Sequence, residues 1–335
     1  MLKTLCMLDA ASGREDAVRD FVLKNLPADA THTVDALGNI LVEKKGAKRA
    51  KHKVALFAHM DEVALLITHI TDDGFLRFET VGGIDARVLF GKAVRLESGA
   101  VGVIGGKAVH HLSKDERDKL PDVHALCIDI GAASREEAER YAALGDNAYF
   151  CADYTEFGDG FVKAKALDDR VGVAILLEML QKPQPYDLTC CFTVQEEIGT
   201  RGAGAAAYTV RPDYAVVLEC TTAADLADVA GHKRVCALGK GAVVGFMDRG
   251  TVYDRDLYRL AFETAEKNNI PCQTKTLVAG GNDAAAIHKA AGGIKTVAVS
   301  VPCRYIHSPS CVAKQADIES TAMLAQCLAE ALCNA

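Results

Sequence analysis

The segment LTCCFTVQEEIGTRGAG (188–204) predicts one buried strand that ends at two adjacent carboxylates. Residues 188–194 form a short apolar run, which is typical of a strand covered on both faces. Glu196 and Glu197 follow it directly, before a glycine-containing turn. Two neighbouring carboxylates at a water-poor strand end repel each other, so a nearby cation is needed if both are to stay ionised. The alternative is a solvated pair of loop acids.

Four further apolar runs predict strands of the same kind. They cover residues 53–58, 160–165, 214–218 and 296–301, and residues 171–180 predict a helix. Strands alternating with helices indicate an α/β fold. Near the N-terminus, Ser12 and Glu15 have the spacing of a capping box, which predicts another helix from about that point.

Metal-binding side chains follow several of these strands. His59 follows the first run, Glu219 follows the third, and His307 lies just beyond the fourth. In open α/β sheets the functional site lies outside the carboxyl ends of the strands. We therefore expect these three side chains and the two adjacent glutamates at one edge of the sheet.

Each of these residues also has an ordinary structural interpretation. A His-x-Asp triplet such as the one from His59 to Asp61 occurs in many loops. Asp168 precedes a helix and fits an N-cap, although it also fits a carboxylate that bridges two metal ions. Glu219 fits an edge acid with a salt-bridge partner, and His307 fits a hydrogen-bonded polar histidine. The constellation carries more weight than any single member.

Residues 67–160 differ in composition from the rest of the chain. They are rich in glycine and β-branched residues, which predicts several short strands joined by tight turns. One helical stretch is expected at residues 134–144, capped by Ser134. We expect this segment to be an inserted, mostly β domain. Residues 1–66 and 161–335 would then form a discontinuous α/β domain.

The bulk composition argues against several classes of protein. A net charge of −7 over 335 residues does not suit a general nucleic-acid binder. No apolar run approaches the roughly 18–20 residues that cross a bilayer, and the first residues lack a signal-peptide pattern, so a cytoplasmic protein is expected. The 12 cysteines are scattered without a CxxC pair, which favours reduced, mostly buried thiols.

The candidate residues together offer two histidines and three carboxylates as metal ligands. A further Glu and a further Asp are not needed as ligands. Imidazole and carboxylate ligands without thiolate suit Zn²⁺, Co²⁺ or Mn²⁺ in a two-metal site. Two metal ions can lower the pKa of a bound water and polarise a carbonyl group. One glutamate of the adjacent pair would bind metal, and the other would stay free to move the proton as a general base.

Six segments of the chain resemble motifs of the M42 family of metallo-aminopeptidases. They are AHMDEV (58–63), KALDDR (165–170), QEEIGTRGA (195–203), LECTTAAD (218–225), AGGNDAAAI (279–287) and VPCRYIHS (301–308). Their order and approximate spacing hold along nearly the whole chain, beginning with SGRE at 12–15. Each motif is modest alone, and together they form a strong signal.

The resemblance implies how metal ions would be held. His59 and Glu219 would bind one ion, and Glu197 and His307 would bind the other. Asp168 would bridge the two. The ions would be Zn²⁺ or Co²⁺, with Mn²⁺ as a third option.

The resemblance also implies a reaction and an architecture. Glu196 would be the catalytic base, and Asp61 would assist by orienting His59. The enzyme would remove N-terminal residues from short peptides. Its catalytic domain would be the three-layer α/β domain of zinc exopeptidases, and residues 67–160 would be a β-rich dimerisation domain. Homo-oligomers from dimers to dodecamers would be expected.

Two other functions are alternatives to this one. Paired carboxylates also suit a glycoside hydrolase, but the chain has no tryptophan to stack on sugars and that reaction leaves two histidines unused. A catalytically silent scaffold on the same fold would lack a ligand or the base, and none is missing.

The chain departs from common family patterns at Ala64, Glu219 and Asn282. The preferred first residue of the substrate stays open; Arg304 is one candidate contact for an acidic side chain, and a structural salt bridge is its alternative.

Overall fold

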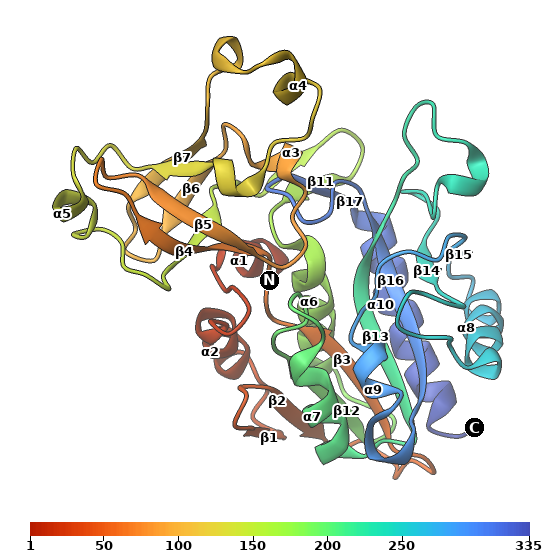
Figure 1. Ribbon diagram of the computed structural model, residues 1–335. Coiled ribbons are helices and arrows are strands. Elements are labelled where there is room, and N and C mark those ends of the chain that lie inside the picture. Colours follow the sequence, from red (N-terminus) through yellow and green to blue (C-terminus); the bar gives the residue numbers. More distant parts are fainter.

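The computed structural model describes residues 1–335, except for the side chain of Glu116. It contains an eight-stranded mixed sheet with helices on both faces and a closed six-stranded barrel, which Figure 1 shows at the upper left. A three-stranded sheet, β10–β11–β17, is separate from both. The predicted α/β fold with an inserted β domain is thereby confirmed.

The central sheet has the strand order β1–β2–β12–β3–β13–β16–β14–β15. Its strands are β1 (Ala30–Val34), β2 (Ile40–Lys44), β3 (Val54–His59), β12 (Leu188–Thr193), β13 (Tyr214–Thr222), β14 (Ala242–Val244), β15 (Cys272–Thr274) and β16 (Lys295–Cys303). The four central strands, β12, β3, β13 and β16, are mutually parallel. Their carboxyl ends therefore meet at one edge of the sheet.

Strand β3 shows why the strand-forming runs are continuously apolar. Val54 and Leu56 belong to the hydrophobic core on one face of the sheet, and Ala55 and Phe57 belong to the core on the other face. Side chains alternate between the faces of a strand, and both faces are covered by helices. All six residues of β3 are consequently buried.

Helices complete the three layers. Those on the first face are α6 (Leu167–Gln181), α8 (Arg255–Lys267) and α10 (Gln315–Leu332), and those on the other are α7 (Arg201–Val210) and α9 (Ala284–Ile287). The N-terminal helices α1 (Leu2–Met7) and α2 (Asp16–Lys24) pack into the first core. Short 3₁₀ turns η3 (Gly231–Lys233) and η4 (Ala290–Gly292) occur in the loops.

The barrel closes in the order β4–β5–β8–β7–β6–β9 around its own apolar core. Its strands are β4 (Ala64–Ile70), β5 (Leu76–Val81), β6 (Ala93–Leu96), β7 (Val101–Gly105), β8 (Cys127–Asp129) and β9 (Asn147–Phe150). Between them lie α3 (Ala86–Leu89), η1 (Val109–His111), α4 (Lys114–Arg117), η2 (Val123–Ala125) and α5 (Arg135–Ala138). Strand β10 (Thr155–Phe157) pairs with β11 (Phe161–Ala164), which pairs with β17 (Cys311–Lys314).

Two predicted helices differ from the structure in extent. The helix expected from Ser12 begins only at Asp16, because Ser12 donates its hydroxyl hydrogen to Asp61 instead of capping a helix. The stretch expected at 134–144 is helical only over α5, although the Ser134 hydroxyl accepts from the Glu137 amide as an N-cap should. The residues after α5 form turns, and Gly145 there has a positive φ of 88°.

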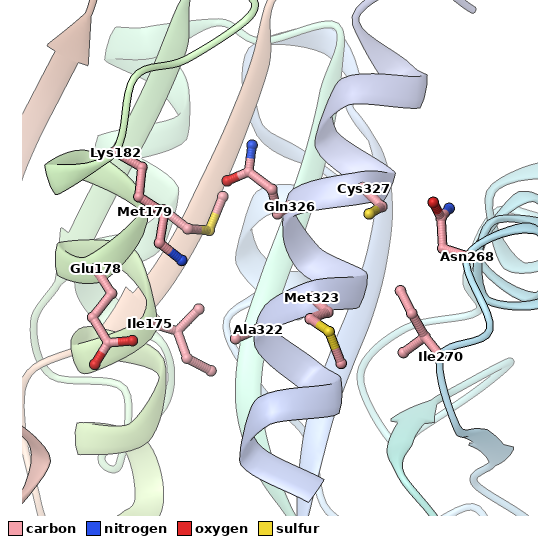
Figure 2. A pocket seen from close by; sticks show the side chains of 10 residues that line it. All are labelled: Ile175, Glu178, Met179, Lys182, Asn268, Ile270, Ala322, Met323, Gln326 and Cys327. Carbon is pink, nitrogen blue, oxygen red and sulfur yellow. The ribbon is translucent and has the colours of Figure 1, made fainter. Parts of the chain in front are cut away.

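A groove of about 310 Å³ lies between α6, α10 and the loop at Asn268. Figure 2 shows that its walls combine aliphatic, sulfur-containing and amide side chains with the charged Glu178 and Lys182, and none of the candidate metal-binding residues is among them. Within the described chain, no helix combines the length and apolar character that crossing a bilayer demands. All 12 cysteines are free, and eight of them are buried.

A buried ionic cluster joins the N-terminal segment, the start of the barrel and the helical layer. The Lys165 ammonium lies 2.6 Å from the Glu62 carboxylate and 2.9 Å from that of Asp9. Arg170 contacts Glu62 at 3.3 Å, and the Asp9 carboxylate also accepts from Arg95 of β6. Lys165, Glu62 and Arg170 are nearly inaccessible to solvent. Glu62 therefore compensates two buried cations just before the chain enters the barrel.

The Glu62→Gln variant should be strongly destabilised, because it leaves Lys165 and Arg170 buried without their shared counter-charge. Loss of one partner from a buried ion pair costs about 3–5 kcal/mol. Guanidinium unfolding followed by circular dichroism would measure this loss. Glu263→Gln, at an exposed position of α8, is the matched control and should change the free energy of unfolding by less than about 0.5 kcal/mol. Equal stability of the two variants would contradict the importance of the cluster.

Candidate active site

The carboxyl edge of the parallel strands brings the predicted site residues together. His59 is the last residue of β3 and Glu219 lies within β13, which continues to Thr222. Glu196 and Glu197 follow β12, in the turn before α7. His307 lies in the loop between β16 and β17. This placement follows from the parallel pairing of four strands that are far apart in sequence.

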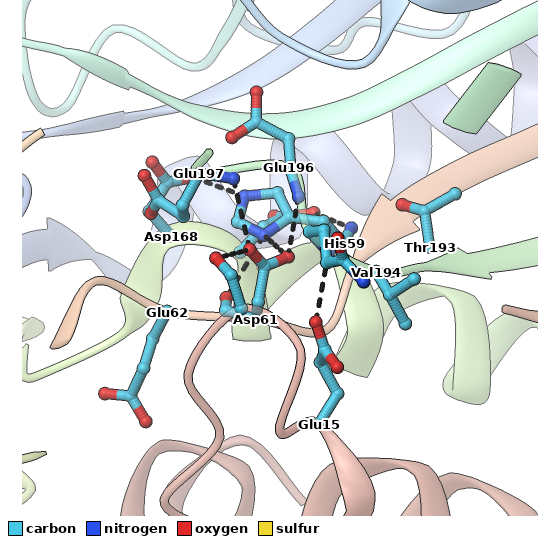
Figure 3. A network of polar contacts seen from close by, with 12 residues as sticks. Glu15, His59, Asp61, Glu62, Asp168, Thr193, Val194, Glu196 and Glu197 are labelled. Atoms are coloured by element: carbon cyan, nitrogen blue, oxygen red, sulfur yellow. Dashed lines mark hydrogen bonds and ion pairs between the residues drawn. The ribbon is translucent and has the colours of Figure 1, made fainter. Parts of the chain in front are cut away.

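Asp168 lies in the non-helical first turn of α6 and occupies the centre of the group. Its Oδ1 is 3.6 Å from Nε2 of His59, and its Oδ2 is 3.5 Å from Nε2 of His307. Glu219 Oε2 is 3.6 Å from the same nitrogen of His59. Glu197 Oε2 is 3.3 Å from the same nitrogen of His307. The donors thus form two groups that share one carboxylate, and Figure 3 shows Asp168 and Glu197 beside the His59 ring.

The donor atoms fit metal ions. Nε2 of His59 and Oε1 of Glu219 are buried without any hydrogen-bond partner among the described residues, which is rare for buried polar atoms. Ligand atoms bonded at ~2.1 Å to one tetrahedral ion lie roughly 3.4 Å apart, close to the separations measured here. His59, Asp168 and Glu197 also offer ligand atoms that all lie within 4.8 Å of one another.

The electrostatics of the cluster show an excess of buried acid. Burial raises the pKa of Glu197 to about 7 and the pKa of Glu219 well above its usual range. Burial lowers the pKa of His307, but Asp168 and Glu197 outweigh it and raise that pKa to about 10. The cluster therefore holds protons when no other positive charge is available. A divalent cation among these groups would replace those protons.

Asp61 connects the end of β3, which carries His59, with the turn that carries Glu196 and Glu197. Its Oδ1 lies 3.3 Å from Nδ1 of His59, and it accepts hydrogen bonds from the backbone amides of Glu196 at 3.0 Å and Glu197 at 3.1 Å. Ser12 donates a further bond of 2.6 Å to its Oδ2. Figure 3 shows these contacts converging on Asp61. Its carboxylate therefore positions both the His59 ring and the turn that carries the two glutamates.

Sequence reasoning missed several residues that support the site. Glu15, expected only in a capping box, accepts a hydrogen bond from the Gln195 amide at 3.1 Å. Asp169 is buried and accepts from the His59 amide at 3.2 Å. Asp283 accepts from the Thr193 hydroxyl. Asp169 directly follows Asp168 in sequence, and Asp283 lies in one of the recognised motifs. Glu15 belongs to the SGRE segment at 12–15, but its local pattern pointed to a helix cap and not to the Gln195 turn.

The Glu196 carboxyl group has no hydrogen bond or ion pair with the described residues, and Figure 3 shows it directed away from Asp61. It lines a cavity of about 150 Å³ together with Asp168, Glu219 and His307. Burial raises the pKa of Glu196 well above its usual range. An uncommitted carboxyl group that faces a cavity can exchange a proton with a molecule bound there.

Arg304 forms a structural salt bridge, which was the alternative to its being a contact for the substrate. Its guanidinium group forms two hydrogen bonds to Asp225, at 2.7 and 2.8 Å. Such a bidentate pair uses the planar fork of the arginine fully. Arg304 is therefore committed to Asp225 and is a poor contact for a substrate side chain.

Comparison with known proteins identifies the family. The M42 glutamyl aminopeptidase model matches residues 38–324. A putative aminopeptidase of Acetivibrio thermocellus is 37% identical over 336 residues, covering 99% of this chain and 98% of the relative. The structure of aminopeptidase APDkam598 from the archaeon Desulfurococcus kamchatkensis has a TM-score of 0.93 and 36% identity, over 98% of this chain and 93% of that one.

A second solved structure is equally informative. The Pyrococcus horikoshii TET1 peptidase, which can assemble into a tetrahedron or a large octahedral shell, has a TM-score of 0.85 and 36% identity, over 98% of each chain. The motif resemblance is confirmed by these matches. The chain therefore belongs to the M42 glutamyl aminopeptidase family of metallopeptidases, and it is a peptide hydrolase.

Proposed function

We propose that this aminopeptidase removes N-terminal residues from short peptides with two divalent metal ions, Zn²⁺ or Co²⁺, with Mn²⁺ as a third option. His59 and Glu219 would hold one ion, Glu197 and His307 the other, and Asp168 both. The observation that carries this assignment is the position of Asp168, whose two oxygens face different histidines. Family membership favours peptide hydrolysis over the glycoside hydrolase and silent scaffold alternatives.

The proposed reaction divides its work between the ions and the protein. When bound, the ions would polarise the peptide carbonyl and make a water molecule easier to deprotonate. Glu196 would accept a proton from the water as it attacks the carbonyl carbon. It would then give that proton to the amine as the carbon–nitrogen bond breaks. Asp61 would act as a positioning residue, because it holds both the His59 ring and the backbone of Glu196.

We further propose that the chain works as a homo-oligomer, between a dimer and a dodecamer. The inserted domain, set at residues 67–160 between catalytic segments 1–66 and 161–335, would provide the dimer contact. The barrel supports this with outward apolar side chains, since Val101 and Val103 of β7 and Phe90 before β6 are exposed. The TET1 peptidase of Pyrococcus horikoshii, which can assemble into a tetrahedron or a large octahedral shell, is a similar protein that supports this proposal. A closed shell would admit short peptides and exclude folded proteins.

Removing and restoring metal tests the proposed activity directly. Chelated protein should release no residue from a panel of aminoacyl-p-nitroanilides and short peptides. Adding Zn²⁺, Co²⁺ or Mn²⁺ should restore release of N-terminal residues, with two ions bound per chain by elemental analysis. Inactivity with every metal, in folded protein that binds two ions, would overturn the proposal.

Glu196→Gln should lower turnover by about 10²–10⁴-fold, because an amide cannot accept the proton. Metal content should stay near two ions per chain, since the Glu196 carboxyl group is not one of the proposed ligands and forms no hydrogen bond or ion pair with them in the described chain. Asp168→Ala is the contrasting variant and should lose bound metal as well as activity. Stopped assays of p-nitroaniline release and elemental analysis on the same samples measure both quantities. Near-normal turnover of Glu196→Gln would remove it from the mechanism.

A further inference from the structure

The turn between β12 and α7 carries Glu196 and Glu197, so its shape decides where the proposed general base lies. Two residues of this turn other than glycine have left-handed backbone angles. The φ angle is 57° at Gln195, directly before Glu196, and 57° at Thr200. Such angles are unfavourable for residues with a side chain, and they persist only where the surrounding structure imposes them. The conformation of the turn therefore depends on support from outside it.

Buried side chains from other parts of the chain supply this support. Four consecutive backbone amides, those of residues 194–197, each donate a hydrogen bond to such a side chain. The acceptors are Asn39 for residue 194, Glu15 for residue 195 and Asp61 for residues 196 and 197, at 3.0, 3.1, 3.0 and 3.1 Å. Figure 3 shows Asp61 and Glu15 on one side of the turn and the Glu196 carboxyl group directed to the other.

Asn39 connects the two ends of the turn. Its Oδ1 accepts from the Val194 amide directly after β12, and its Nδ2 donates to the Gly202 carbonyl in the first turn of α7 at 3.1 Å. The same Nδ2 also donates to Asp35 at 2.7 Å. A Cβ at Gly202 would lie 2.4 Å from Oδ1 of Asn39, so glycine is needed for this close approach. Only an amide side chain can accept at one end of the turn and donate at the other in this way.

The position of Asn39 is itself fixed by the loop before β2. The Oδ1 atom of Asp35 accepts from the backbone amides of Leu37, Gly38 and Asn39 at 2.9, 3.0 and 3.0 Å. Asn39 is inaccessible to solvent, and its side-chain oxygen and nitrogen both have partners. A buried polar network with every group satisfied holds a single arrangement. Both ends of the turn are therefore placed by the fold before any substrate binds.

We propose that Asn39 and Glu15 are positioning residues for Glu196, because they hold the turn in the conformation that directs the Glu196 carboxyl group into the cavity. The assignment rests on the proposed function, in which Glu196 moves the proton. A general base must lie within about 2.6–3.2 Å of the group whose proton it accepts, so a small shift of the turn lowers the rate. Asp61 would still hold the Glu197 amide, which keeps that proposed metal ligand in place.

The test separates turnover from substrate binding. Asn39→Ala should lower kcat of metal-loaded protein by about 10- to 100-fold, as expected for a displaced catalytic group, with KM nearly unchanged. Glu15→Ala should do the same, whereas Glu15→Gln keeps the acceptor oxygen and should restore kcat towards the wild-type value. Gln184→Ala is the matched control, since this buried amide donates to the Met179 and Lys182 carbonyls at the C-terminal end of α6. It should lower stability as Asn39→Ala does and leave kcat unchanged.

Hydrogen exchange gives a readout that needs no activity. Mass spectrometry should show faster deuterium uptake over residues 194–202 in Asn39→Ala and Glu15→Ala, with or without metal. Loss of one hydrogen bond predicts an increase of about fivefold. Gln184→Ala should show the wild-type uptake in this segment. Elemental analysis should find the same metal content in all these variants as in wild type.

The outcomes distinguish this proposal from the proposed function. Wild-type uptake or wild-type kcat in Asn39→Ala would overturn the positioning role, and so would loss of metal, because the residue would then act on Glu197. If Asn39→Ala does not fold, equal kcat values for Glu15→Ala and Glu15→Gln would overturn the role. Faster uptake in the variants of a protein that hydrolyses no peptide with any metal would overturn the proposed function, while the support of the turn would stand.

Discussion

The shared carboxylate of Asp168 is the constraint on which the geometry of the site depends. It lies between His59 and His307 and also accepts a hydrogen bond from the Cys220 amide of β13 at 3.2 Å. That bond ties the first turn of α6 to the strand that carries Glu219. Burying so many acids together is unfavourable unless positive charge compensates them. This electrostatic cost arises at the same edge of the sheet that supplies the two imidazoles and the ligand oxygens. Metal ions bound by these groups would remove the cost.

The inserted domain belongs to this site as much as the sheet does. The Gly83 carbonyl, in the loop after β5, contacts Nδ1 of His307 at 2.8 Å and so fixes the ring with its other nitrogen toward Asp168. Gly82 beside it has a φ of 85°, and a Cβ there would lie 2.8 Å from Val63 and 3.2 Å from Glu197. Only glycine allows that approach. An oligomer contact on the barrel would therefore act on a domain that holds one of the proposed metal ligands.

The sequence predicted those features that local patterns encode. The strand before Glu196 was predictable because a strand buried on both faces must be apolar throughout, and its end is marked by the first charge. The hydrogen bonds that support the turn after this strand were not predictable. Ser12 contacts Asp61 from 49 residues away, and Glu15 contacts Gln195 from 180 residues away. Their spacing also fits a helix cap, and only tertiary structure decides which partner wins. The dimerisation role of the barrel and the domain limits stay predictions for the same reason.

The two cations near the site illustrate why specificity is harder to predict than chemistry. Arg304 lies three residues before His307, so sequence proximity favours it as a substrate contact, but its guanidinium is neutralised by Asp225. Lys275 belongs to no recognised motif, and it reaches the cavity because β15 joins the far edge of the sheet through β14. Without metal, the nearby acids partly balance its charge.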